Sequence, residues 1–177
     1  MIPYKLREFL ARFTLSRFME KPRKNRVVEI TAPKSIAVFV SPSDAANPAT
    51  IRESAAVLLK HFGGVDLNFY TYTPKIKKDV VYSERYLQVL DPEDVNWYLK
   101  PLNMKPAHAD ILLDFTRKPH IPLRFFTLFS KSRLRAGVTS PWNEGLLDIQ
   151  FDVTEKFELT YVCGQFIHYF ELLKDRK

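Results

Sequence analysis

Cysteine, glycine and long apolar runs are all scarce in this chain of 177 residues. Cys163 is the only cysteine, which excludes an internal disulfide framework, and we expect a small buried side chain there rather than a reactive thiol. No apolar run reaches the ~18 residues that a membrane span needs, and the N-terminus lacks an uninterrupted apolar segment followed by a small-residue cleavage site. We therefore expect a protein of the reducing cytoplasm.

The five glycines form no phosphate-binding motif. Neither G-x-G-x-x-G nor G-x-x-x-x-G-K-[ST] follows the first expected strand, so a dinucleotide or nucleotide site of the usual kind is not predicted. The four histidines are far apart and lack ligand spacing, and no G-x-S-x-G elbow is present. The sequence therefore predicts no metal and no cofactor, and it does not decide whether the protein is an enzyme.

The net charge of +7 is concentrated at the N-terminus. Residues 1–26 hold eight basic side chains against two acidic ones, whereas the rest of the chain holds 19 against 18. The high isoelectric point therefore describes an N-terminal segment and not the domain. Because the domain is nearly neutral and carries no recognition motif, we do not expect nucleic-acid binding.

That basic segment has helical periodicity. Pro3 suits the first turn of a helix, and an apolar stripe at helical spacing follows it, made of Leu6, Phe9, Leu10 and Phe13. An isolated helix of this length is marginal in water, so the stripe must be buried against something. Its own domain, a second copy, another protein and an anionic membrane surface all remain open. We expect residues 1–26 to form a basic amphipathic helix and connector, and residues 27–177 a single α/β domain.

Strands and helices alternate through the rest of the chain. Helices are predicted at 49–62, 121–131 and 157–174, with Gly63 and Gly64 closing the first of them. Short strands are possible at 27–30 and 95–99. The main strands are expected at Ser35–Val40, Asp66–Tyr72, 109–115, Leu134–Val138 and 146–153. This alternation predicts a single doubly wound, mainly parallel sheet with helices on both faces, a Rossmann-like α/β fold.

The strongest local feature is the strand that ends at Asp114. Ligands of open α/β sheets bind at the carboxyl ends of the strands, so Asp114, Thr116 and Arg117 should border a cleft there with Ser41 and Ser43, which follow the first strand. The simpler interpretation is that Asp114 pairs with Arg117 or caps the following loop.

Downstream, Lys131 and Arg133 belong to a group of three cations between a helix end and a strand start. Cations there complement the helix dipole. The functional alternative is an anion site opposite Asp114.

The chain resembles, nearly end to end, an uncharacterised family of small Bacteroidetes proteins, a domain of unknown function. The resemblance rests on the basic N-terminal helix and on residues 34–36, 94–97, 100–101, 110–114, 122–123, 130–133 and 148–149. Members often have an acidic residue where the first strand ends, and this chain has Ser41 there. The resemblance implies no activity.

A shorter stretch is similar to the N-terminal half of heptosyltransferase-type glycosyltransferases. An Asp-x-x-x-Asp strand, a helix and a basic strand ending near glycine occur in the same order, here at 110–114, 121–131 and 133–137. The resemblance supports the fold; those enzymes need a second domain, for which this chain has no room.

Two functions follow from these patterns. The leading interpretation is a non-catalytic cytoplasmic binding module that docks a protein partner, or an anionic membrane surface, through its N-terminal helix. The alternative is a small enzyme or ligand-binding protein that uses an anion site at the carboxyl edge of the sheet near Asp114.

Overall fold

The structure is a computed structural model that describes residues 4–19, 32–74, 84–153 and 157–174. Its elements in chain order are α1 (Tyr4–Met19), β1 (Ser35–Val40), α2 (Pro42–Ala45), α3 (Pro48–Phe62), β2 (Asp66–Tyr72), β3 (Leu87–Leu90), the 3₁₀ helices η1 (Pro92–Asp94) and η2 (Lys105–His108), β4 (Ile111–Phe115), α4 (Ile121–Phe129), β5 (Leu134–Val138), β6 (Ile149–Phe151) and α5 (Leu159–Lys174).

The six strands form one sheet in the order β3-β2-β1-β4-β5-β6, and every neighbouring pair is parallel. This is the strand order of the dinucleotide-binding doubly wound fold. The predicted fold class is confirmed, and so is the prediction that the five main strands share one sheet.

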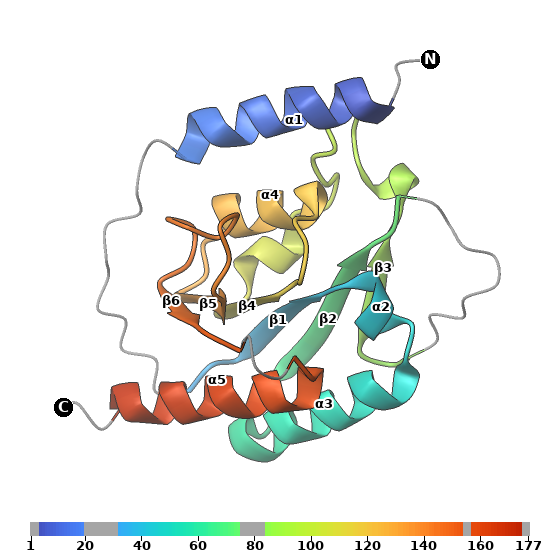
Figure 1. The fold of residues 1–177 in the computed structure, drawn as a ribbon. Helices are drawn as coiled ribbons and strands as arrows, with labels where there is room; N and C mark the ends of the chain where they lie inside the picture. The colour runs from blue at the N-terminus through green and yellow to red at the C-terminus, as the bar shows by residue number, and fades with distance from the viewer. Residues whose placement is uncertain (1–3, 20–31, 75–83, 154–156, 175–177) are drawn as a thin grey trace.

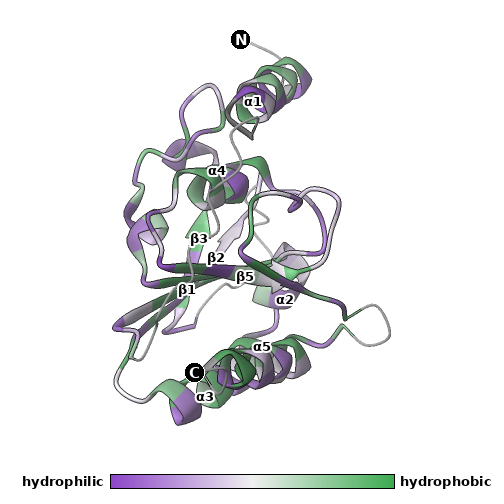
Figure 2. Ribbon diagram, turned by 90° about the vertical axis from the view of Figure 1, so that its left-hand side faces the viewer, coloured by the Kyte–Doolittle hydropathy of each residue, from purple (hydrophilic) through white to green (hydrophobic). Residues whose placement is uncertain are grey.

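Helices cover both faces of the sheet (Figures 1 and 2). α3 and α5 lie side by side on one face, and α4 covers the other with α1 outside it. β1 shows why its run is apolar without a break: Ile36 and Val38 belong to the core under α3 and α5, whereas Ala37 and Phe39 belong to the core under α4. A central parallel strand is buried on both faces and so needs apolar side chains on both.

Helix α1 packs on its own domain, but not through the predicted stripe. Ala11 and Leu15 are fully buried in the core cluster that α4 covers. Arg7 reaches the segment before β4, where its guanidinium donates to the carbonyl oxygens of Trp97 (3.0 Å) and Asn96 (3.0 Å). Leu6, Phe9 and Phe13 are exposed and Leu10 is half-buried, so the expectation that this stripe is the packing face is wrong.

Several element boundaries differ from the sequence predictions. β3 was not predicted, and the possible strand at 95–99 is replaced by an isolated antiparallel bridge between Val95 and Pro101. The loop after β1 contains the single helical turn α2, and β6 is shorter than predicted. The possible strand at 27–30 and the proposed cap at Thr154 lie outside the described residues. Within those residues, no helix is long and apolar enough to cross a membrane.

Candidate functional site

The carboxyl ends of β1 and β4 meet where the chain reverses its direction across the sheet. From β1 the chain crosses through α3 to β2 on one side, and from β4 it crosses through α4 to β5 on the other. The two helices lie on opposite faces (Figure 2), so the loops that leave β1 and β4 diverge at this edge. Open α/β sheets bind ligands at such a switch point.

A clasp of hydrogen bonds joins the two loops. The backbone N–H of Arg117 donates to Ser41 Oγ (2.9 Å), and Arg117 Nη2 donates to Ser43 Oγ (2.7 Å) and Asp44 Oδ1 (2.7 Å). The guanidinium also lies 5.0 Å from the ring centroid of Phe157. The structure therefore brings together Ser41, Ser43 and Arg117 as expected, and adds Asp44.

The clasp leaves little positive charge for an anion. Asp44 is the ion-pair partner of Arg117. Burial raises the pKa of Asp44, and the charge and hydrogen bond of Arg117 oppose that rise. Because the guanidinium is already neutralised by Asp44, it holds the two loops in place rather than presenting a vacant anion site.

Asp114 is 1% exposed and caps the turn that follows its strand. Its Oδ1 accepts hydrogen bonds from the backbone N–H of Thr116 (3.0 Å) and from Thr116 Oγ1 (2.7 Å). Burial raises the pKa of Asp114, while the bonds from Thr116, the nearby amide of Asn143 and the charge of Arg124 act against that rise. The loop-capping interpretation is confirmed, and Arg117 pairs elsewhere.

The second carboxylate oxygen of Asp114 lies in a group of buried polar atoms without hydrogen-bond partners. Asp114 Oδ2, Ser140 Oγ, Trp142 Nε1 and both side-chain polar atoms of Asn143 have none. The loop after β5 carries three of these residues, and it is held over β4 by a bond from Arg124 Nη2 to the carbonyl oxygen of Trp142 (2.8 Å). Buried polar atoms are rarely left unpaired, so this group marks a place where a polar molecule could bind.

Arg124, Ser140, Trp142 and Asn143 were missed from the sequence. They carry no motif, and they approach Asp114 only because α4 and the loop after β5 fold back over the carboxyl end of β4. The available signal was the Asn and Ser in a loop that directly follows a central strand, since such loops gather at the same edge of the sheet.

The structure does not bring Lys131 and Arg133 to this edge. The backbone N–H of Lys131 donates to the carbonyl oxygen of Ala107, and that of Arg133 donates to Asp110, which precedes β4. Both residues come before β5, so they lie at the amino ends of the parallel strands. The expected anion site formed by these cations opposite Asp114 is therefore wrong in its geometry.

The predicted cleft also needs correction. Two pockets lined by described residues lie over β1, β2 and β3, and neither is lined by Ser41, Ser43, Asp114, Thr116 or Arg117. The predicted members of the site do meet, but as a clasp and a capped turn. A ligand role for them remains a prediction.

The second sequence-predicted surface is the outer face of α1. Phe9 is 65%, Phe13 61% and Leu6 47% exposed, at positions i, i+3 and i+7 of one helix face. Three exposed cations, Lys5, Arg12 and Arg17, flank them. Trp97 and Tyr98 are also exposed and adjoin α1 through the hydrogen bond from Arg7.

One protein family matches almost the whole of this architecture. It is described as a family of unknown function, DUF6913, and the match covers residues 7–173, from α1 through most of α5. No curated protein and no solved structure matches the chain. Because the match spans well over half of the sequence, the chain belongs to the family of unknown function DUF6913.

Proposed function

We propose that this protein is a non-catalytic binding module of the cytoplasm that docks a partner protein through the outer face of α1. The observation that carries the proposal is the exposure of Leu6, Phe9 and Phe13 together on one face of a helix whose other face is packed into the domain. Large apolar side chains that gather on a surface, rather than scattering singly, mark interaction sites.

The helix is well placed to act as a rigid docking element. Ala11 and Leu15 anchor it in the core, and Arg7 ties it to the carbonyl oxygens of Asn96 and Trp97. The outer face therefore needs no ordering when a partner arrives, and a pre-organised surface avoids that entropy cost. Aromatic anchors such as Phe9 and Phe13 supply much buried area with few rotatable bonds.

The charges around this face favour an acidic partner. Lys5 and Arg17 are exposed without an ion pair among the described residues, and Arg12 is the partner of Glu8 four residues before it. Complementary charge speeds the encounter and selects the partner. We favour a protein over a lipid surface because one short helix with three apolar anchors gives only modest, reversible membrane attachment.

Co-purification from the native cell tests the proposal with three matched forms of the full chain. These are the wild type, Phe9→Ser/Phe13→Ser on α1, and Leu172→Ser/Leu173→Ser, which alters two similarly exposed apolar side chains on α5. We expect one protein at constant stoichiometry with the wild type and the α5 variant, and its loss with the α1 variant.

The same three forms are then mixed with vesicles that contain anionic lipid. Flotation of the wild type that is lost in the α1 variant, without any co-purifying protein, would replace the protein partner with a membrane. Equal recovery of the same protein by all three forms would refute docking through α1.

A second candidate function is the binding of a small polar ligand beside Asp114. It is supported by the unpaired atoms of Asp114, Ser140, Trp142 and Asn143, each of which costs about 1–3 kcal/mol when buried without a partner. A ligand that satisfies them recovers that cost. Soaking or co-crystallisation with polyols tests this function: density bonded to Asp114 Oδ2 supports it, and ordered water alone refutes it.

The lineage is part of the proposal as well. A Bacteroidetes origin and the partial similarity to heptosyltransferase-type glycosyltransferases, over residues 110–137, are predictions from the sequence. The similarity concerns the strand order around β4 and β5, and no transferase activity is proposed from it.

A further inference from the structure

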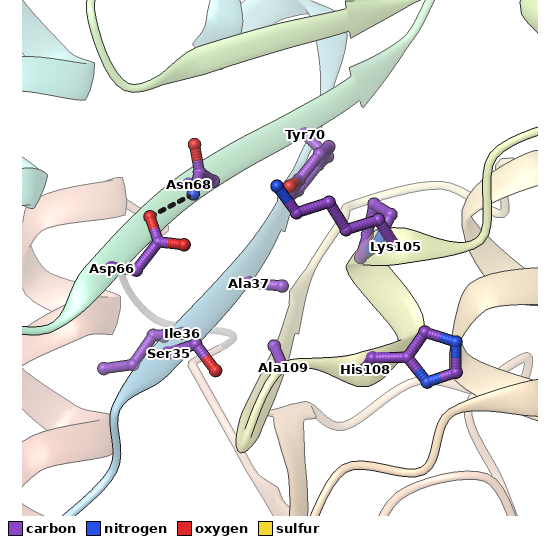
Figure 3. A pocket seen from close by; sticks show the side chains of 10 residues that line it. Ser35, Ile36, Ala37, Asp66, Asn68, Tyr70, Lys105, His108 and Ala109 are labelled. Carbon is purple, nitrogen blue, oxygen red and sulfur yellow. Dashed lines mark hydrogen bonds between the residues drawn. The ribbon is translucent and has the colours of Figure 1, made fainter.

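The connection between β3 and β4 leaves part of the sheet without a covering helix. Between these strands the described chain forms only the short 3₁₀ helices η1 and η2. η2 stands over the amino-terminal parts of β1 and β2 and encloses a pocket of about 170 Å³ (Figure 3). The pocket is lined by Ser35, Ile36, Ala37, Asp66, Asn68, Tyr70, Lys105, Pro106, His108 and Ala109.

A second pocket of about 290 Å³ continues the first toward β3. The two share Tyr70, Lys105 and Pro106, and the second adds Gln88 and Asn103 among its lining residues. The pair forms one groove between the sheet and the segment that leads to β4.

The sequence of β2 matches this groove. Its side chains on the groove side are Asp66, Asn68, Tyr70 and Tyr72, polar in the first half of the strand and aromatic in the second. The aromatic half is packed in the core under α4. Parallel strands usually carry apolar side chains on both faces, so the polar half is unusual and fits a wet, open surface.

The polar side chains on the floor of the groove are ordered by hydrogen bonds. Gln88 Nε2 donates to Asn68 Oδ1 (3.2 Å), and Asn68 Nδ2 donates to Asp66 Oδ1 (2.8 Å), the bond drawn in Figure 3. Each amide is thereby fixed in orientation. Asp66 Oδ2 remains available to accept a hydrogen bond from a ligand.

Two opposite charges face the pocket without neutralising each other. Figure 3 shows Lys105 reaching from η2 toward Tyr70 on β2, while Asp66 lies at the other end of the polar row. The ammonium of Lys105 has no hydrogen bond or ion pair among the residues that the structure describes, although an acid lines the same pocket. Burial, with the nearby charge of Asp66, raises the pKa of Tyr70 to about 12, so its hydroxyl stays protonated.

We propose that this pocket binds a small zwitterion of the α-amino acid class, with the carboxylate of the ligand at Lys105 and its ammonium at Asp66. Asn68 and Tyr70 lie between the two charges and supply hydrogen-bonding groups for the ligand's centre. The size agrees, because a cavity of about 150 Å³ holds a molecule as large as benzene, which leaves room for an amino acid and not for a nucleotide.

Titration of the ¹⁵N-labelled full chain with each common amino acid, followed by amide chemical shifts and by calorimetry, tests the proposal. We expect saturable binding of at least one amino acid, with shifts confined to residues 35–37, 66–70 and 103–109. Lys105→Met and Asp66→Asn should each weaken that binding at least tenfold, or by about 1.4 kcal/mol.

Matched controls separate the pocket from general charge effects. Lys60→Met and Glu53→Gln remove exposed charges from α3 on the opposite face of the sheet and should leave the affinity unchanged. Asp114→Asn should also leave it unchanged, which distinguishes this pocket from the buried polar group after β4.

Three outcomes would overturn the proposal. One is no saturable binding of any amino acid at millimolar concentration. Another is shifts centred on other residues or binding that survives both pocket substitutions. The third is equal binding of acetate or inorganic phosphate, which would show an anion site that does not use Asp66.

Discussion

Replacing Leu15 by alanine is a direct perturbation of the packing between α1 and the domain. Leu15 is 1% exposed and lies in the same core cluster as Leu99 and Phe125. Shortening a buried leucine to alanine removes about 2–5 kcal/mol of folding free energy, because the lost apolar contacts are joined by the cost of a cavity. In a chain of this length each kcal/mol lowers Tm by about 2–4 °C, so we expect a fall of roughly 4–20 °C.

Phe9 provides the matched control on the same helix. Its ring is larger than the side chain of Leu15, but it is 65% exposed. Exposed substitutions usually change stability by no more than about 0.5 kcal/mol, so Phe9→Ala should unfold with the wild type. The contrast is informative because an apolar-stripe argument from the sequence alone predicts the opposite ranking.

Urea denaturation followed by circular dichroism measures both variants, with equal m values showing that the extent of unfolding is unchanged. Amide hydrogen exchange along α1 adds a local readout: protection should fall in Leu15→Ala and not in Phe9→Ala. A wild-type midpoint for Leu15→Ala, or an equal loss in both variants, would refute the packing described here.

The remaining predictions concern the edge near Asp114 and the core. Because burial raises the folded-state pKa of Asp114 above its ordinary 3.8, the folded protein binds more protons there than the unfolded chain, and stability should fall as pH rises from that value through the raised pKa; Asp114→Asn should lessen this fall in pH-dependent urea midpoints. Gly137→Ala should lower Tm strongly or prevent folding, since its Cβ would overlap the carbonyl oxygen of Asp114 and press on Leu147; a wild-type Tm would contradict the close approach of β5 to β4. Arg117→Ala should cost at most about 1 kcal/mol, because its ion pair with Asp44 is largely exposed on the arginine side, and a much greater loss by denaturation would show that the clasp holds the sheet together. Burial raises the pKa of Cys163 to about 12, so a thiol reagent should modify it only after unfolding, and rapid modification of the native protein would oppose this.

Sequence periodicity was sufficient for the central strands. The runs at Ser35–Val40 and Asp66–Tyr72 are buried and apolar enough to be recognised, and their strand bounds agree with the structure. β3 has only four residues and lies at the edge of the sheet with partly exposed side chains, so its sequence carries neither a clear alternation nor a long apolar run. Its place is determined by pairing with β2, which local sequence does not encode.

The orientation of α1 could not be predicted because two of its faces carry apolar residues. The larger side chains, Phe9 and Phe13, form the more conspicuous stripe, yet the small Ala11 lets the helix approach the domain closely beside Leu15. Close packing depends on the shape of both surfaces, and the partner surface is assembled from distant segments such as Leu99 and Phe125.

The candidate site was predictable to the extent that it follows from topology. The approach of Ser41 to Arg117 follows from the rule that parallel strands end at one edge. The same rule places residues that precede a strand at the opposite edge, which is where Lys131 and Arg133 lie. The contribution of Asn143 depends on how the loop after β5 folds over β4, and no pattern in the sequence specifies that path.

Photo-crosslinking in the native cell tests the docking role of α1 most directly. A photoreactive residue placed at Phe13 is compared with the same residue at Leu172 on α5, since both positions are exposed and apolar. We predict one discrete cross-linked protein from position 13 and none from position 172, with the product lost when Phe9→Ser is added. Absence of any protein adduct from position 13, or the same products from both positions, would contradict a partner-binding face on α1.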